Sequence, residues 1–211
     1  MNIAIIGASA GVGLETVKRA LDLGHHVTTL ARSELLVPDV PNLTKLKGSA
    51  TTKADLVRAI EHADAVIVAL GTGKSMKATT LYSDFARLLV QVQQELNLDI
   101  PFIVLTGFGA GESSHYHGSW VMRMFFKYLL KDVYLDKTLM EQIIAQSPMN
   151  WVMVRPGLLK DAPLTEQYRV ETKLYKGMNI GSVCRADVAD FMVKQAEKPN
   201  YLHQYPALSN R

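Results

Sequence analysis

A glycine-rich turn near the amino end constrains the fold of this chain more than any other feature of its sequence. The segment Gly7-Ala8-Ser9-Ala10-Gly11-Val12-Gly13 follows the apolar run Ile3–Ile6. A helical pattern comes next, with Leu14, Val17 and Leu21 on one face. A buried strand that turns through glycines into a helix is typical of the first unit of a parallel α/β sheet.

The same turn has the backbone chemistry of a pyrophosphate site. Gly7 allows the tight turn, Gly11 lets backbone approach the phosphates, and Gly13 lets the helix pack closely on the strand. Free N–H groups and the positive end of the helix dipole favour anions there. A turn that merely connects two elements is the alternative, which the strand–turn–helix context disfavours. We expect the phosphates to be lined by Gly7, Ser9, Ala10, Gly11, Val12 and Gly13.

Apolar strand-like runs alternate with helical patterns along the rest of the chain. The expected strands are Ile3–Ile6, His26–Leu30, Leu43–Leu46, Ala65–Leu70, Pro101–Leu105 and Trp151–Val154. After the first helix, further helices are expected at Asp55–Glu61, Leu81–Leu96, Trp120–Ala145 and Asp187–Lys198. This alternation predicts an α/β fold with a Rossmann-type, doubly wound parallel sheet flanked by helices. Residues 1–211 are expected to form a single domain, with Leu158 to Val183 as a small C-terminal cap on the substrate side.

Composition excludes several classes of protein. The chain has 211 residues, 48% of them hydrophobic, and a net charge of only +3 with no basic run, so a nucleic-acid partner is not expected. The single cysteine, Cys184, cannot form an internal disulfide, which fits a reducing compartment. No signal peptide or membrane span is recognisable. We expect a cytoplasmic monomer or weak homodimer without a membrane partner.

The end of the second predicted strand indicates which cofactor is bound. Arg32 and Ser33 stand where an acid would meet a free ribose 2′-hydroxyl. A guanidinium instead matches a 2′-phosphate, so NADP(H) is preferred over NAD(H). The alternative is a solvated surface arginine that Glu34 neutralises.

Several further motifs coincide with one family. They are the glycine loop, Ala31-Arg32-Ser33, Ala69-Leu70-Gly71-Thr72-Gly73, Lys137-x-x-x-Glu141, Trp151 to Gly157, and Arg185-Ala-Asp187-Val-Ala. Together they resemble the atypical short-chain dehydrogenase/reductases. The nearest resemblance is to the NAD(P)H-binding, NmrA-like group that includes flavin and biliverdin reductases. It extends from Met1 to about Lys198 and is specific for cofactor binding but not for a substrate.

The resemblance implies further site residues. Ala69, Leu70 and Gly71 would border the adenosine, and Pro156, Gly157 and Leu158 would hold the carboxamide. Thr106 would lie near the nicotinamide, and Lys137 would lie near the adjoining ribose. Each of these two residues would serve in cofactor binding and in catalysis. An ordinary ion pair between Lys137 and Glu141, one helical turn apart, is the alternative for that lysine.

The chain departs from the catalytic pattern of the wider family. A Tyr-x-x-x-Lys dyad needs tyrosine four residues before lysine. Tyr134 precedes Lys137 by three residues, and Tyr128 precedes Lys131 by three. Spacing of four places both groups on one helix face, so this dyad is not expected. Alcohol–ketone chemistry by that route is therefore in doubt, whereas flavin- and biliverdin-type reductases lack the dyad and remain compatible.

The loop Gly107–Ser119 offers the candidate proton donors. His115 or Tyr116 could donate a proton after hydride transfer, since histidine titrates near neutral pH. A polar loop without chemical function is the alternative. A metal site with His117 is a weak hypothesis, because no cluster of acids or cysteines accompanies it.

Two functions from different classes remain. One is an NADPH-dependent oxidoreductase that transfers hydride to a flat acceptor such as a flavin, quinone or linear tetrapyrrole. The other is a non-catalytic NAD(P)-binding redox sensor of the NmrA-like type that acts through a protein partner. A deep cleft beside Thr106 would favour the enzyme, and an exposed apolar patch without a closed pocket would favour the sensor.

Overall fold

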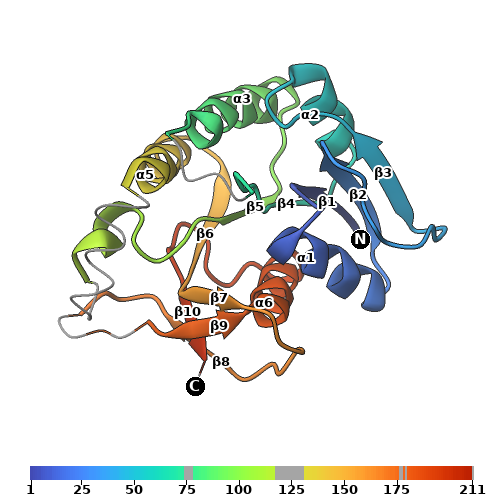
Figure 1. The fold of residues 1–211 in the computed structure, drawn as a ribbon. Helices are drawn as coiled ribbons and strands as arrows, with labels where there is room; N and C mark the ends of the chain where they lie inside the picture. Colours follow the sequence, from blue (N-terminus) through green and yellow to red (C-terminus); the bar gives the residue numbers. More distant parts are fainter. Residues whose placement is uncertain (74–77, 117–130, 176–177, 179, 211) are drawn as a thin grey trace.

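A twisted sheet of eight strands forms the centre of the protein in a computed structural model (Figure 1). The structure describes residues 1–73, 78–116, 131–175, 178 and 180–210. The strands lie in the order β3-β2-β1-β4-β5-β6-β10-β8, all parallel except for the pairing of β8 with β10. Their bounds are β1 Asn2–Ile6, β2 His26–Ala31, β3 Leu43–Lys47, β4 Ala65–Val68, β5 Pro101–Leu105, β6 Asn150–Pro156, β8 Tyr168–Glu171 and β10 Ala207–Asn210.

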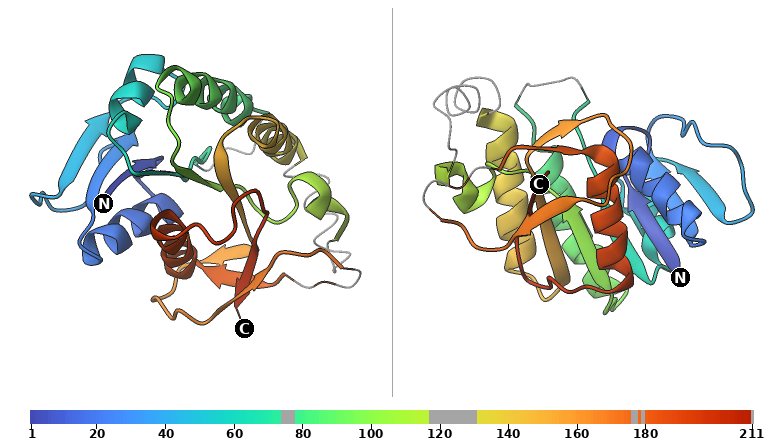
Figure 2. Two further views of the ribbon diagram at one scale, coloured as in Figure 1. Left: turned by 180° about the vertical axis from the view of Figure 1, so that it is seen from behind. Right: turned by 90° about the horizontal axis from the view of Figure 1, so that it is seen from below.

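Helices cover both faces of this sheet (Figures 1 and 2). One face carries α1 (Gly11–Asp22) and α6 (Arg185–Glu197), and the other carries α2 (Lys53–Ile60), α3 (Leu81–Glu95) and α5 (Lys131–Ala145). Each face has its own apolar core because side chains alternate along a strand. In β1, Ile3 and Ile5 pack toward α1 and α6, whereas Ala4 and Ile6 pack toward α2 and α3. No helix in the described ranges is both long enough and apolar enough to cross a membrane.

The strand order reverses beside β1, which places a ligand crevice there. From β1 the chain passes outward through β2 to β3, then returns to β4 on the other side of β1. Connections that leave in opposite directions open a crevice at the carboxyl ends of the two central strands. The glycine loop after β1 and the segment after β4 meet at this crevice.

The predicted doubly wound parallel sheet is confirmed, with differences near the carboxyl end. All six expected strands are present. The expected helix from Trp120 is described only from Lys131, since residues 117–130 lie outside the described part. The loop after β5 contains a short 3-10 helix, η1 (Gly111–Tyr116).

The predicted cap, from Leu158 to Val183, is divided between two sheets. β7 (Leu158–Lys160) pairs with β9 (Ser182–Cys184) in a separate two-stranded sheet. β8 joins the main sheet through β10, which was not predicted because Ala-Leu-Ser-Asn is short and has little apolar character.

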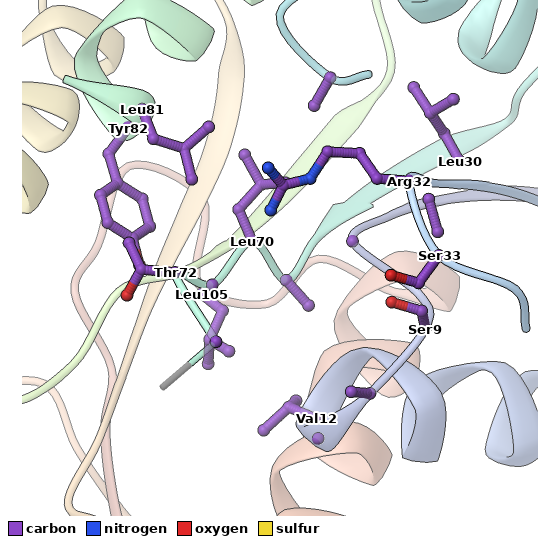
Figure 3. A pocket seen from close by; sticks show the side chains of 18 of the residues that line it. Ser9, Val12, Leu30, Arg32, Ser33, Leu70, Thr72, Leu81, Tyr82 and Leu105 are labelled. Atoms are coloured by element: carbon purple, nitrogen blue, oxygen red, sulfur yellow. The ribbon is translucent and has the colours of Figure 1, made fainter. Parts of the chain in front are cut away.

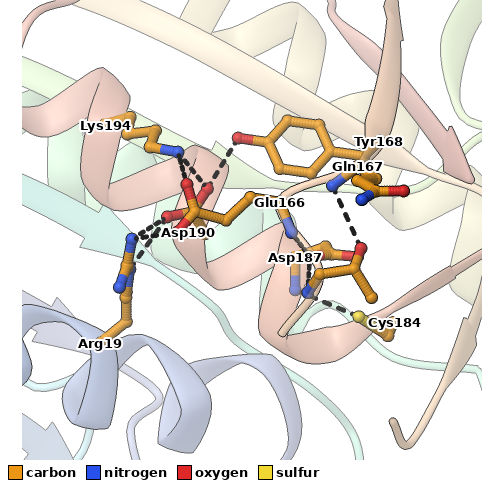
Figure 4. A network of polar contacts seen from close by, with 9 residues as sticks. Arg19, Glu166, Gln167, Tyr168, Cys184, Asp187, Asp190 and Lys194 are labelled. Atoms are coloured by element: carbon orange, nitrogen blue, oxygen red, sulfur yellow. Dashed lines mark hydrogen bonds and ion pairs between the residues drawn. The ribbon is translucent and has the colours of Figure 1, made fainter. Parts of the chain in front are cut away.

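The buried carboxylate of Asp190 connects the cap to helices α1 and α6 (Figure 4). Asp190 of α6 is fully buried and forms ion pairs with Arg19 of α1 at 2.6 Å and with Lys194 at 2.7 Å. The hydroxyl of Tyr168, at the start of β8, donates to the same carboxylate at 2.9 Å. Asp190 therefore joins α1, α6 and the cap at one point.

A second carboxylate holds the loop before β8. Asp187 accepts the backbone N–H groups of Thr165 and Glu166, each at 2.8 Å, and the Thr165 hydroxyl at 2.7 Å. Burial alone would raise the pKa of Asp187, but these bonds and one with Cys184 outweigh it and lower that pKa. The start of α6 and the loop it holds thus form one fixed unit.

Candidate cofactor-binding site

A pocket of about 660 Å³ lies at the carboxyl ends of β1, β2, β4 and β5. This volume falls within the range typical of small-molecule sites. Its lining comes from loops that follow these strands, from α3 and α5, and from the cap. The lining residues are 7, 9–12, 30–33, 48–51, 69–73, 81–82, 105–106, 133–134, Lys137, Leu159 and Arg185.

The glycine loop forms one wall of the pocket, and two of its glycines, Gly7 and Gly13, are required by close packing. A Cβ atom on Gly7 would lie 2.6 Å from the carbonyl oxygen of Ala69, and the φ of Gly7 is +89°. A Cβ on Gly13 would lie 2.1 Å from the carbonyl oxygen of Gly7. Gly13 is buried and does not line the pocket, so it acts through helix packing, whereas Gly7, Ser9, Ala10, Gly11 and Val12 all line it.

Arg32 and Ser33 mark the end of the pocket beside β2. Figure 3 shows the Arg32 side chain extending into the pocket, whose lining also includes Ser33 after β2 and Ser9 of the glycine loop. Among the described residues no carboxylate lies within 4.0 Å of the Arg32 guanidinium, so Glu34 does not neutralise it by an ion pair. The arginine is exposed and available to an anion.

Lys137 of α5 reaches the opposite end of the pocket. Its ammonium donates to the carbonyl oxygen of Thr106 at 2.6 Å and lies 5.3 Å and 5.4 Å from the ring centres of Tyr82 and Tyr134. Burial lowers the pKa of Lys137 to about 8, against the opposing influence of the Glu141 charge. This cation is therefore held at a fixed place by one carbonyl and two aromatic faces.

The ion pair considered between Lys137 and Glu141 does not form. Glu141 instead makes a bidentate pair with Arg155, at 3.1 Å to Nε and 2.7 Å to Nη2. Both side chains are almost fully buried, and the Arg155 guanidinium also lies 4.1 Å from the ring centre of Tyr205. Glu141 therefore does not pair with Lys137, whose ammonium faces the pocket.

Tyr134 and Lys137 meet despite their spacing of three, which corrects the earlier inference from helix geometry. Side chains three apart on a helix are neighbours as well as those four apart. Both line the pocket, and the Tyr134 hydroxyl lies against the backbone of Gly107. Burial, with smaller contributions from Tyr82 and Glu141, raises the pKa of Tyr134 well above its usual value.

Thr106 lines the pocket but is itself buried. Its N–H donates to the carbonyl oxygen of Val154 at 2.8 Å, and its hydroxyl donates to the same oxygen at 3.3 Å. With its own carbonyl bonded to Lys137, Thr106 joins β5, β6 and α5. A direct catalytic part for its hydroxyl stays a prediction.

Tyr116, a candidate proton donor, is not among the residues that line the pocket. Tyr116 packs with Phe108 and Met178 in a small apolar cluster. The side chain of His115, and all of His117, fall outside the described part of the chain. Their proposed part in proton transfer stays a prediction.

The segment expected to hold the carboxamide is packed into the protein. The N–H of Phe108 donates to the carbonyl of Pro156, and a Cβ on Gly157 would lie 2.0 Å from the carbonyl oxygen of Gly181. Leu158 is exposed, and the next residue, Leu159, lines the pocket instead. The role expected of these three residues therefore stays a prediction.

Two groups stand out among the lining residues that were not predicted. Residues 48–51 follow β3 and line the pocket because β3 pairs in parallel with β2. Since the carboxyl ends of parallel strands meet at one edge of a sheet, the predicted third strand could have indicated these residues. Tyr82 and Arg185 come from helix starts far apart in sequence. Tyr82 has no local signal, and the motif that begins at Arg185 indicated the family without indicating that Arg185 enters the pocket.

The fold and this pocket define a Rossmann-type protein built to hold a dinucleotide. The chain belongs to the NAD(P)H-binding family, whose model matches residues 7–199. The predicted NAD(P)H-binding family is thereby confirmed.

Solved structures share the fold over nearly the whole chain. A short-chain dehydrogenase/reductase (wide type) from Veillonella parvula, in complex with NADP, is 16% identical, with a TM-score of 0.83 over 99% of this chain and 94% of that one. The anaerobilin reductase ChuY from Escherichia coli O157:H7 is 20% identical, with a TM-score of 0.78 over 100% and 97%. A protein proposed to be an NADH-flavin reductase from Streptococcus pneumoniae is 22% identical, with a TM-score of 0.77 and full coverage of both chains.

Proposed function

We propose that this protein is an NADPH-dependent reductase that transfers hydride to a flat small-molecule acceptor. The observation that carries the proposal is the pocket itself, with a glycine loop on one wall, Arg32 at one end and Lys137 at the other. Three lining side chains are cationic, and the described lining residues include no aspartate or glutamate. Such a pocket suits an elongated anion.

Each end of the pocket would hold a different part of the cofactor. Backbone N–H groups of the loop from Gly7 to Val12 would bind the pyrophosphate, and Arg32 with Ser33 would bind the 2′-phosphate. Lys137 would orient the ribose next to the nicotinamide. When bound, the nicotinamide supplies the hydride, and the protein contributes proximity and orientation.

The aromatic side chains beside Lys137 fit this assignment. Tyr82 and Tyr134 offer flat apolar surface where the acceptor would lie. The raised pKa of Tyr134 keeps its hydroxyl protonated at neutral pH, so it can donate but not remove a proton. Solvent, His115 and Tyr116 remain the other candidate donors.

A flavin, quinone or linear tetrapyrrole is the proposed acceptor class. Structures of the same fold include an anaerobilin reductase and a proposed NADH-flavin reductase, whose names refer to a bilin and a flavin. We infer the same class for this chain. Mixing the protein with NADPH and FMN, FAD, quinones or biliverdin, and following the loss of nicotinamide absorbance, tests it. NADPH binding with no turnover on any acceptor would favour the sensor instead.

Preference for NADPH rests on Arg32. A charge-assisted hydrogen bond of about 1.5–3 kcal/mol corresponds to roughly ten- to a hundredfold in affinity. Dissociation constants for NADPH and NADH, measured for the natural protein and for Arg32→Ala, test the assignment. The variant should lose this preference, and an unchanged ratio of the two constants would refute it.

A further inference from the structure

Arg185, at the first position of α6, faces the glycine loop from the cap side of the pocket. A Cβ atom built on Gly11 would lie 3.8 Å from the Nε of Arg185, the nearest heavy atom outside the loop. Both residues line the pocket, and the φ of Gly11 is +58°. The guanidinium is therefore next to the backbone that would meet the pyrophosphate.

The other two cations of the pocket are committed elsewhere. Arg32 extends from the end of β2, where a 2′-phosphate would lie (Figure 3). Lys137 is bonded to the carbonyl of Thr106 after β5. The loop between these two ends would hold the two negative charges of a pyrophosphate. Arg185 is the remaining cation among the described lining residues.

The present partner of Arg185 is easily replaced. Nη1 donates to Asp161 at 2.7 Å, which uses one of the five N–H donors of the guanidinium. The Asp161 side chain is 90% exposed, whereas that of Arg185 is 27% exposed. An ion pair with a solvent-exposed carboxylate contributes little, and phosphate offers a second, bidentate partner.

The backbone on either side of this pair is held in place. The Cys184 sulfur, which caps α6, accepts the N–H of Asp187 at 3.4 Å and donates to the carbonyl of Pro163. Asp187 in turn bonds Thr165. The side chain of Arg185 can therefore exchange partners without movement of α6.

We propose that Arg185 is a second ligand of the cofactor pyrophosphate. It binds from the side opposite the glycine loop and exchanges Asp161 for a phosphate oxygen when the cofactor enters. This inference rests on the proposed function, because it requires a nicotinamide dinucleotide in the pocket. It assigns α6 a direct part in cofactor binding and the cap an indirect one through Asp161, which the glycine loop alone would not give them.

Dissociation constants for NADPH, NADH and ADP-ribose test the proposal in the full-length protein. ADP-ribose carries the pyrophosphate but neither nicotinamide nor 2′-phosphate. Arg185→Ala should weaken all three by about ten- to a hundredfold, leaving the NADPH to NADH ratio unchanged. Arg185→Lys should recover part of the affinity, because it restores the charge without the planar fork.

Two matched controls separate this effect from net charge. Arg87→Ala removes an arginine from an exposed ion pair outside the pocket lining and should leave the three constants unchanged. Asp161→Asn should tighten binding by about two- to fivefold, because Arg185 is released. Asp39→Asn removes an equally exposed acid, 94% exposed in its pair with Lys45, and should not tighten binding.

The possible failures are distinguishable. A natural protein that binds neither NADPH nor NADH overturns the proposed function and, with it, this inference. Binding that persists unchanged in a folded Arg185→Ala variant overturns the inference alone. A loss confined to NADPH would assign Arg185 to the 2′-phosphate, and a loss confined to the KM of the acceptor would assign it to the substrate; either overturns the pyrophosphate assignment. If Arg185→Ala does not fold, Arg185→Gln gives the same comparison.

Discussion

At the scale of single residues, the charges of the half-buried Lys137 and the buried Arg155 dominate the chemistry of this protein, and they differ in how they are compensated. Among the described residues, the ammonium of Lys137 contacts a carbonyl oxygen and two aromatic faces but no carboxylate. Arg155 has a carboxylate, Glu141, in bidentate contact. The charge of Lys137 costs free energy to hold in place, and its lowered pKa lets a nearby ligand change its protonation, which suits a ligand site. The charge of Arg155 is neutralised and fixed, which suits the interior of a fold.

Because the pKa of Lys137 is lowered, the free energy of unfolding should vary with pH in the alkaline range. Its pKa is about 8 in the folded chain and 10.5 for an ordinary lysine, so between these values the unfolded state binds more protons. The free energy of unfolding should therefore rise with pH from about 8 to about 10.5, by at most about 3 kcal/mol. Chemical denaturation of the natural protein and of Lys137→Met across this range gives the difference. A constant difference between the two would contradict the expected titration.

Removing one partner of the buried pair Glu141–Arg155 should strongly destabilise the fold, whereas replacing both partners by apolar residues should not. Their side chains are only 3% and 2% exposed. Glu141→Ala leaves a guanidinium without its main partner and should lower the free energy of unfolding by about 3–5 kcal/mol. The double variant Glu141→Leu with Arg155→Met should recover most of that loss in urea denaturation. If the double variant were as unstable as the single one, packing rather than charge would explain the effect.

At the scale of elements, the joint between β1 and α1 determines whether the phosphate loop keeps its shape. Gly13 meets the carbonyl of Gly7 so closely that no side chain fits. The helix can start directly beneath the loop only because that Cβ is absent. Packing and ligand binding therefore depend on the same contact.

Gly13→Ala should consequently damage both properties at once. A Cβ placed 2.1 Å from the oxygen of Gly7 forces the loop and α1 apart, and such overpacking costs about 1–3 kcal/mol. We expect a lower melting temperature and at least about tenfold weaker NADPH binding, measured by calorimetry, since a 1.4 kcal/mol loss is a tenfold change. Gly71→Ala is the matched control for stability, because its Cβ would meet nothing closer than 3.9 Å. Equal losses of stability in both variants would argue against this explanation.

The elements that could be predicted from sequence are those with a strong local signal. The buried parallel strands are continuous apolar runs, and the first loop has glycines between a strand and a helix, so both could be inferred. β10 has no such run, and its place between β6 and β8 depends on pairing between distant segments. Arg185 reaches the pocket for the same reason, since only the packing of α6 beside α1 places it opposite Gly11.

At the scale of the whole molecule, the two apolar cores share one sheet and should unfold together. Leu208 of β10 is fully buried in the core below the sheet, and β10 joins β6 to the antiparallel strand β8. The cap is connected to the Rossmann sheet through the four-residue strand β10, and to α6 through the carboxylates of Asp187 and Asp190. The strand order is continuous from β3 to β8, so the part of the cap that contains β8 belongs to the main sheet, whereas β7 and β9 form a separate pair.

Leu208→Ala tests this coupling. The lost burial and the remaining cavity should lower the free energy of unfolding by about 2–5 kcal/mol. In a Trp120→Phe background, Trp151 of β6 is the only tryptophan, since the chain has two. Its fluorescence reports on β6, whereas far-ultraviolet circular dichroism reports on all helices and strands. The two unfolding curves should coincide and shift together in the variant. If circular dichroism changed before the Trp151 signal, the carboxyl-terminal part would be unfolding separately, and the sheet would not act as one cooperative unit.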